Sequence, residues 1–241
     1  MTFGMSTHKL RGVFVSACLA LAAPITALAD AAFPVVVELY TSQGCSSCPP
    51  ADRLFQELAK RDDVIPLALH VDYWDYLGWK DTMGDPQHTK RQKAYAHVAG
   101  AGSIYTPQMI VGGQTHVIGH KPMQLADAIA AASVALPGVE LQLTRSGNTI
   151  NVSANPEQGL PRDMVVQLFR YIPSYDVSIR RGENAGKVIT YVNAVTGIEQ
   201  IGTWNGRNTL RLRQTVTGDE PVVVVLQERG PGKILAAARV K

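Results

Sequence analysis

The chain has 241 residues, with 23 Lys and Arg against 20 Asp and Glu, and a formal net charge of +3 at pH 7. The first 29 residues contribute two of the basic residues and no acidic one, so the remainder carries 21 − 20 = +1. This near-neutral remainder has no block of Lys and Arg of the kind that binds nucleic acid, and with 46% hydrophobic residues the chain can bury a sizeable core.

Residues 1–29 are typical of a secretory signal peptide. Lys9 and Arg11 precede a mostly apolar run, and a small residue, a leucine and a second small residue, Ala29, stand just before Asp30. We therefore predict cleavage after Ala29 and export to the periplasm or the exterior, where disulfides form and persist. An acylated start at Cys18 is the alternative. Because no later stretch approaches 18 unbroken apolar residues, no membrane span is predicted.

Residues 30–136 are expected to form an α/β domain with a mixed sheet flanked by helices. β-branched runs over residues 33–41 and 64–72 predict buried strands. Between them, apolar residues at helical spacing from Ala51 to Lys60 predict a helix, which we expect to begin at Pro49 and Pro50 because these residues lack N–H donors. An aromatic loop over residues 73–86 precedes a predicted polar helix, a hairpin around Gly112 and Gly113, and an Ala-rich helix over residues 122–134. The expected order is therefore strand, helix, strand, helix, strand, strand, helix.

The residue pattern changes near Pro137. Residues 137–241 alternate between apolar and polar positions in eight or nine short segments, separated by Gly, Pro and Asn and without a helical stretch. This pattern predicts an all-β, antiparallel, sandwich-like domain, whose role would be to recognise a partner or to hold the orientation of the first domain. Two domains are thus expected to meet near Pro137.

Cys45 and Cys48 are the only cysteines after residue 29, and they stand where a predicted strand turns into a helix. A Cys-x-x-Cys motif at such a turn is the arrangement of thioredoxin-like redox sites. A thiolate at a helix start meets free backbone N–H groups and the positive end of the helix dipole, which lower its pKa. We therefore predict a catalytic pair in which Cys45, the outer thiol, attacks and Cys48 resolves the mixed disulfide. A purely structural bridge is the alternative.

Three neighbours can tune the sulfurs. Ser46 and Ser47 can donate hydroxyl hydrogen bonds to a sulfur, and His70, on the second predicted strand, can influence a thiol through its imidazole. His70 also completes an alternative ligand set, with Cys45 and Cys48, for Cu(I) or Zn(II). We otherwise expect no metal, and no cofactor beyond the redox-active disulfide itself.

Two further segments are candidates for docking a substrate. Thr106 and Pro107 stand directly before a predicted strand, where thioredoxin-like proteins carry a cis-proline that faces the cysteines. Such a turn would present the Thr106 backbone to an extended polypeptide. Trp74 and Tyr76 lie in the aromatic loop, and they are expected either to dock a peptide or to anchor that loop, together with Trp79, onto the core.

The segment over residues 181–187, RGENAGK, predicts a tight turn, because Gly182 and Gly186 tolerate a left-handed backbone. Glu183 and Asn184 can bond a neighbouring backbone from this turn. A structural turn and a loop that contacts the redox site are both compatible with the sequence.

Four segments resemble a bacterial secreted family labelled domain of unknown function 1223: ELYTSQGCSSCPPADRLFQELA, LHVDYWDYLGWKD, YTPQMIVGG and RGENAGKVITYVNAV. The resemblance implies a thioredoxin-like N-terminal part, an exported protein and redox roles for Cys45, Cys48 and Pro107, and it names no substrate. The chain departs from thioredoxin in having no Trp before Cys45, Ser-Ser between the cysteines and no acidic proton-transfer residue identifiable by motif.

The sequence is therefore compatible with three functions. The first is a periplasmic thiol–disulfide oxidoreductase acting on the cysteines of an envelope protein or a redox partner. The second is a module that holds Cu(I) or Zn(II), and the third is a non-enzymatic envelope adaptor with a structural disulfide. No pattern for a hydrolase or a nucleotide-binding enzyme occurs in the sequence.

Overall fold

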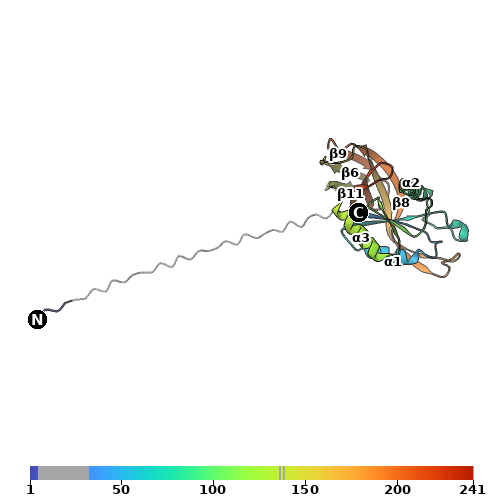
Figure 1. Ribbon diagram of the computed structural model, residues 1–241, viewed down its shortest axis with the longest axis horizontal. Helices are drawn as coiled ribbons and strands as arrows, with labels where there is room; N and C mark the ends of the chain where they lie inside the picture. The colour runs from blue at the N-terminus through green and yellow to red at the C-terminus, as the bar shows by residue number, and fades with distance from the viewer. Residues whose placement is uncertain (5–32, 136, 138, 241) are drawn as a thin grey trace. The chain divides into compact units, whose positions relative to one another are not determined.

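The computed structural model describes residues 1–4, 33–135, 137 and 139–240 (Figure 1). The predicted cleavage site after Ala29, the alternative acylation site Cys18 and most of the predicted signal peptide lie outside these described residues. All helices and strands among the described residues fall between residues 35 and 240.

The elements up to residue 134 occur in the predicted order. They are β1 (Val35–Thr41), α1 (Pro49–Leu58), β2 (Val64–His70), α2 (Pro86–Val98), β3 (Gln108–Val111), β4 (Thr115–Ile118) and α3 (Pro122–Val134), with a short 3-10 helix, η1 (Asp75–Leu77), between β2 and α2. β1 pairs in parallel with β2 and antiparallel with β3, which pairs antiparallel with β4. The mixed sheet flanked by helices is thus confirmed.

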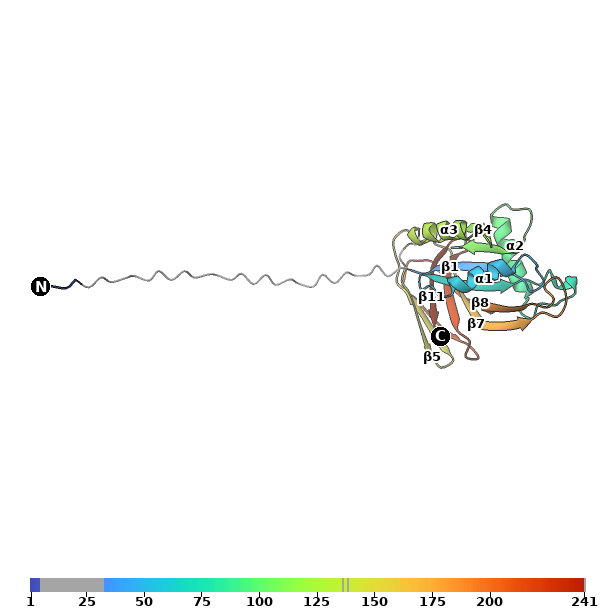
Figure 2. The ribbon, with the colours of Figure 1, turned by 90° about the horizontal axis from the view of Figure 1, so that it is seen from below.

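Helices cover both faces of this part of the sheet, because alternate residues of β1 point to opposite faces. Val37 and Leu39 pack with α1 and α3 in one core, whereas Val36 and Tyr40 pack in a second core with Tyr95 of α2. Figure 2 shows α1 and α3 running along the strands of the sheet, with α2 to the right of α3. This packing fixes the start of α1 against the end of β1, where the two cysteines lie.

The second half of the chain is entirely β among the described residues. It contains seven strands, β5 (Leu141–Ser146), β6 (Thr149–Ala154), β7 (Met164–Ser178), β8 (Val188–Trp204), β9 (Leu210–Thr215), β10 (Val222–Glu228) and β11 (Ile234–Val240). The predicted eight or nine short strands are therefore too many, since β7 and β8 each unite two predicted segments. Pro173 cannot donate to a ladder, but β7 continues through it. The pairing of β7 with β8 shifts register between Val166 and Gln167 and again between Arg170 and Tyr171.

The predicted boundary at Pro137 does not divide the sheet. One eight-stranded sheet has the order β11-β10-β7-β8-β2-β1-β3-β4, and strands from both halves of the chain meet where Ala68 of β2 pairs with Ala194 of β8. A second sheet, β5-β6-β9, packs on β7, β10 and β11 in a shared core, so two β layers do form. The expectation of a separate sandwich is corrected, because the strands β11-β10-β7-β8 of its larger layer continue directly into the sheet of the first half.

A buried ion pair links β1, α2 and the second half of the chain. Arg91 donates from Nε to Oε1 of Glu38 at 2.6 Å, and both side chains are largely or fully buried. Its other guanidinium nitrogens donate to Gln167 at 3.1 Å and to Tyr95 and Gln227 at 3.0 and 2.9 Å. Burial alone would lower the pKa of Arg91, but the Glu38 carboxylate raises it above the ordinary value, so the guanidinium stays charged.

No helix in the described part of the chain has both the length and the apolar composition required to cross a membrane.

Candidate redox site

Cys45 and Cys48 form a disulfide in the turn between β1 and α1, with their Cα atoms 5.4 Å apart. The turn is closed by backbone hydrogen bonds from Cys45 N to Ser42 O and from Cys48 N to Cys45 O. Cys48 is the N-cap of α1, and Pro49 and the proline after it occupy the first helical positions. The predicted helix start at the prolines is therefore confirmed, as Pro is suited to a position whose N–H has no helical partner.

Neither cysteine is freely exposed. Cys45 is 4% exposed and Cys48 is fully buried, whereas Ser46 and Ser47 between them are exposed. Cys45 is thus the more accessible of the two, as predicted, but the expectation of an outward-facing sulfur has to be corrected. The hairpin between β7 and β8 and the aromatic loop that carries Trp74 both lie against this turn.

The donors around the Cys45 sulfur differ from those of a simple helix start. The two prolines have no N–H, and the first amide after them, on Ala51, donates to Cys48 O at 2.8 Å. The helix dipole remains, but fewer free N–H groups face the sulfurs than at a helix start without prolines. The Ser47 hydroxyl lies 3.4 Å from the Cys45 Sγ, and since that sulfur has no proton in the disulfide, Ser47 is the donor. Ser46 makes no comparable contact among the described residues.

The hairpin between β7 and β8 closes over the cysteine turn. Asn184, which is 1% exposed, donates from Nδ2 to Gln43 O and to Cys45 O, both at 2.9 Å. Lys187 Nζ donates to Asn184 Oδ1 at 2.7 Å and so orients the amide. Gly182 has a φ of 74°, as the predicted tight turn requires. The RGENAGK segment therefore forms a turn and also contacts the site.

The Thr106–Pro107 peptide bond is cis, as predicted. Pro107 lies beside the first turn of α1, and Gly119 makes this approach possible. A Cβ at Gly119 would lie 2.8 Å from Pro107 Cβ and 3.0 Å from Ala51 Cβ, closer than side chains tolerate. No pattern in the sequence around Gly119 indicates this role.

Trp74 connects the two turns of the site. Its indole Nε1 donates to Thr106 Oγ1 at 2.7 Å. Gly44 lies close to Trp74, because a Cβ added to Gly44 would be 3.2 Å from both the Cβ and the carbonyl oxygen of Trp74. Trp74 therefore anchors the aromatic loop, one of its two predicted roles. Tyr76 stacks on Trp74 with ring centroids 6.3 Å apart and is 76% exposed, so it remains available for docking.

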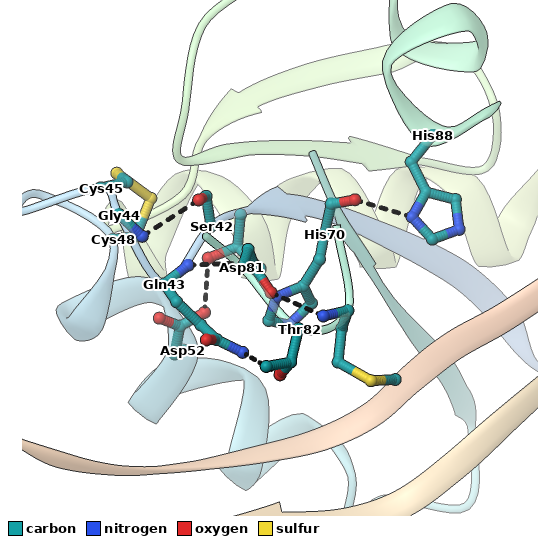
Figure 3. A network of polar contacts seen from close by, with 12 residues as sticks. Ser42, Gln43, Gly44, Cys45, Cys48, Asp52, His70, Asp81, Thr82 and His88 are labelled. Carbon is teal, nitrogen blue, oxygen red and sulfur yellow. Dashed lines mark hydrogen bonds and ion pairs between the residues drawn. A yellow bond between two sulfur atoms is a disulfide. The ribbon is translucent and has the colours of Figure 1, made fainter. Parts of the chain in front are cut away.

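His70 takes part in a buried network next to the cysteine turn (Figure 3). Its Nδ1 lies 2.8 Å from Asp81 Oδ2, and the same oxygen accepts from Gln43 N at 2.7 Å. Burial alone would raise the pKa of Asp81, but the His70 imidazole and these hydrogen bonds hold it below its ordinary value. Asp81 is therefore ionised at neutral pH, and His70 carries its proton on Nδ1 when neutral. Gln43 is fixed further by Trp79, whose Nε1 donates to Gln43 Oε1 at 2.8 Å.

The alternative metal set does not come together as a ligand cluster. His70 uses Nδ1 for Asp81, and its Nε2 lies 3.5 Å from the Tyr175 hydroxyl. In Figure 3 the sulfurs of Cys45 and Cys48 lie on the other side of the segment Ser42 to Gly44 from His70. Within the described ranges, no group of three or more His, Cys, Asp or Glu side chains is arranged to hold a metal ion.

Asp52 is a buried acid that sequence reasoning missed. It stands one helical turn after Cys48, and its backbone N–H donates to Cys48 O at 3.1 Å. Thr41 Oγ1 donates to Asp52 Oδ1 at 2.8 Å, while Oδ2 is buried without a hydrogen-bond partner among the described residues. Burial raises the pKa of Asp52 to about 7, although Thr41 and His70 counteract part of the rise. The sequence does contain a signal for this buried acid, because Asp52 falls between Ala51 and a phenylalanine in the stripe of α1 that helical periodicity places in the core.

A family model described as "Protein of unknown function (DUF1223)" matches residues 36–227. The crystal structure of a protein from Agrobacterium tumefaciens, a structural genomics target, is similar with a TM-score of 0.76 at 28% sequence identity, covering 87% of this chain and 94% of that one. HBP35 of Porphyromonas gingivalis is similar with a TM-score of 0.54 at 15% identity, covering 86% of this chain and 74% of that one, which indicates a shared fold alone. No curated protein matches the chain.

Proposed function

This chain belongs to the DUF1223 family of proteins of unknown function, and we propose that its cysteine pair exchanges disulfides with the cysteines of other proteins. The observation that carries the proposal is the Cys45–Cys48 disulfide at the start of α1, where Pro107 and Ala51 of the first helical turn both lie against Gly119. We further propose that the first half of the chain is thioredoxin-like, on the strength of the sheet order β2-β1-β3-β4, the helices on both faces and this proline.

A stabilising role explains the disulfide poorly. On the loop-entropy estimate, closing about four residues contributes about 2 kcal/mol, against about 3 kcal/mol for a loop of about 15 residues. The bridge also lies between residues that backbone hydrogen bonds already hold in a turn. Redox exchange gives this arrangement a purpose that stability does not.

The exchange has two steps. In the reduced protein, the Cys45 thiolate attacks a partner disulfide, forms a mixed disulfide and releases one partner thiolate. Cys48 then loses its proton and attacks the Cys45 sulfur, which releases the second partner thiolate and restores the Cys45–Cys48 disulfide. Two electrons pass to the partner, and the reverse sequence oxidises a partner dithiol. The direction depends on the two reduction potentials.

Asp52 is suited to the second step. Cys48 is fully buried, so its proton requires a nearby acceptor, and Asp52 lies one turn along the same helix with an unpartnered carboxylate oxygen. With a pKa of about 7, this carboxyl can take up and release a proton near neutral pH. Thr41 holds the other oxygen in place.

An exported location belongs to the same proposal. The disulfide and the absence of a membrane-spanning helix from the described residues are compatible with a secreted or periplasmic protein. Tyr76, exposed beside Trp74, and the turn at Thr106 and Pro107 would then receive the partner polypeptide.

The proposal is tested by trapping in the native envelope. Cys48→Ser removes the resolving thiol, so a partner attacked by Cys45 remains attached and is identified after gel separation without reductant. Cys45→Ser is the matched control and should trap much less. Copper or zinc bound stoichiometrically after gentle purification, and lost in both variants, would favour the metal-binding alternative. Normal cellular function of the double Cys→Ser variant would favour the adaptor.

A further inference from the structure

A groove runs beside the disulfide, between the start of α1 and the start of β8. Its volume is about 580 Å³, and it is lined by residues 187–190 and by Ser46, Pro49, Pro50, Arg53 and Gln56. Ser46 lies between the two cysteines in sequence, so a ligand in the groove touches the redox turn itself. The groove includes neither Pro107 nor the aromatic loop, and it is therefore separate from the docking surface described above.

The charges that line this groove are all positive. Arg53 and Lys187 line it, and no Asp or Glu in the described part of the chain does. Arg53 is exposed and has no hydrogen bond or ion pair within the described part of the chain. Lys187 is exposed and uses one donor on Asn184 Oδ1, which leaves two of the three donors of its ammonium group. The exposed acids of the same hairpin, Asp176 and Glu183, do not line the groove, and Asp176 accepts a hydrogen bond from the Thr190 hydroxyl.

The groove also offers apolar surface and a strand edge. Val188 is 69% exposed there. β8 pairs with β7 at this end, and its pairing with β2 is confined to Ala194. Among the described residues, the other edge of β8 therefore has no neighbouring strand beside the groove. Gln56 Nε2 donates to Thr190 O at 2.7 Å and occupies one backbone acceptor of that edge. An extended chain with an apolar and an acidic side chain matches these features.

We propose that the groove binds an acidic, extended segment of the polypeptide partner and thereby directs a cysteine of that segment to Cys45. This inference rests on the proposed exchange function and adds the chemical class of the partner. The opposite charges attract the partner and favour the orientation in which its cysteine approaches the turn at Ser46.

The test uses two short peptide disulfides of equal length, one with Asp and Glu and the other with Lys and Arg around the cysteine. Exchange with the reduced protein is followed at about 0.01 M and about 1 M salt, where the Debye length falls from about 30 Å to about 3 Å. We expect the acidic peptide to react at least about fivefold faster at low salt, with most of the preference lost at high salt.

Arg53→Gln with Lys187→Gln should reduce this preference to about twofold or less. Lys60→Gln with Lys121→Gln removes the same charge from exposed positions outside the groove and should retain it. Equal rates for the two peptides, or an equal loss in both double variants, would overturn the groove proposal. The rate with a small neutral disulfide is the reference for each variant, because Lys187→Gln also removes the hydrogen bond that orients Asn184 and can change the basal rate. Failure of the wild-type protein to react with this disulfide would count against the exchange function instead.

A second measurement tests the groove if no exchange occurs. A fluorescent copy of the acidic peptide with Ser in place of Cys should bind the wild-type protein, as measured by anisotropy, and bind the Arg53→Gln, Lys187→Gln variant at least about fivefold more weakly. Absence of binding, or binding that these substitutions do not change, would contradict the proposal.

Discussion

The side-chain amide of Asn184 donates a hydrogen bond to the carbonyl of Cys45 at 2.9 Å. The two residues are 139 positions apart in sequence, so a hairpin of the second half of the chain holds the turn that carries the disulfide. The all-β half therefore contributes directly to the candidate site.

Asn184→Ala should destabilise the protein and loosen the cysteine turn. The substitution removes donors from two carbonyls at Gln43 and Cys45, and leaving buried acceptors without partners costs about 1–3 kcal/mol. We expect a lower midpoint of denaturant unfolding and faster reduction of the disulfide by a small thiol. Glu183→Ala, on the same hairpin but exposed, is the control and should change neither measurement. A variant at position 184 that reduces at the wild-type rate would show that the contact does not restrain the turn.

Asp52→Asn should make the protein more stable at pH 8 and leave its stability nearly unchanged at pH 4. The folded-state pKa of Asp52, about 7, lies above the ordinary value of 3.8, so the folded protein holds this proton more tightly than the unfolded chain. The stabilisation is complete below about pH 4 and is lost as the pH rises to about 7. The neutral amide avoids this loss, which the two pKa values put at about 4 kcal/mol at pH 8, and Thr41 can still donate to its oxygen.

Urea unfolding at several pH values measures this difference, and a variant less stable than the wild type at pH 8 would contradict it. The same variant separates stability from chemistry. If Asp52 accepts the proton of Cys48, the Asp52→Asn variant should resolve a preformed mixed disulfide more slowly than the wild type at neutral pH, even though the fold of the variant is more stable.

Arg91→Met should destabilise the protein by about 3–5 kcal/mol, because it leaves the Glu38 carboxylate buried without its partner. Lys90→Met, at the adjacent exposed position of α2, should change the free energy of unfolding by no more than about 0.5 kcal/mol. Denaturant unfolding of both variants checks the difference. Equal stability of the two would mean that the ion pair contributes nothing to the link between β1 and α2.

Gly119→Ala should push Pro107 away from α1. Its methyl group would lie 2.8 Å from Pro107 Cβ and 3.0 Å from Ala51 Cβ, and overpacking of this kind costs about 1–3 kcal/mol. We expect slower exchange with a peptide disulfide but little change with a small thiol that does not use the proline turn. Gly102→Ala is the control, because nothing lies within 4 Å of a Cβ there. Unchanged peptide exchange in the Gly119 variant would remove Pro107 from the docking surface.

Local features of the site follow from the sequence, whereas features that depend on distant contacts do not. The turn at Cys45 and Cys48, the helix start at the prolines and the cis bond before Pro107 each depend on residues adjacent in the chain. The contact of Gly119 with Pro107 and the shared sheet at Ala68 and Ala194 arise only when separate elements pack together.

Asp52 illustrates why part of the site escaped prediction. Periodicity places it in the buried stripe of α1, but the hydrogen bond from Thr41 and the nearness of His70 arise only from the packing of α1 against the ends of β1 and β2. The join between the two halves of the chain escaped for a similar reason. Alternating residues after Pro137 predict strands, but they do not say which sheet each strand enters.

The most direct measurement is the pH dependence of Cys45 alkylation in reduced, folded Cys48→Ser protein. The start of α1 and the Ser47 hydroxyl should stabilise the thiolate, so we expect half-maximal reactivity below about pH 7.5. A thiol that reacts only as the pH rises beyond about 8.5, like an ordinary cysteine, would leave the exchange without its attacking group and contradict the account.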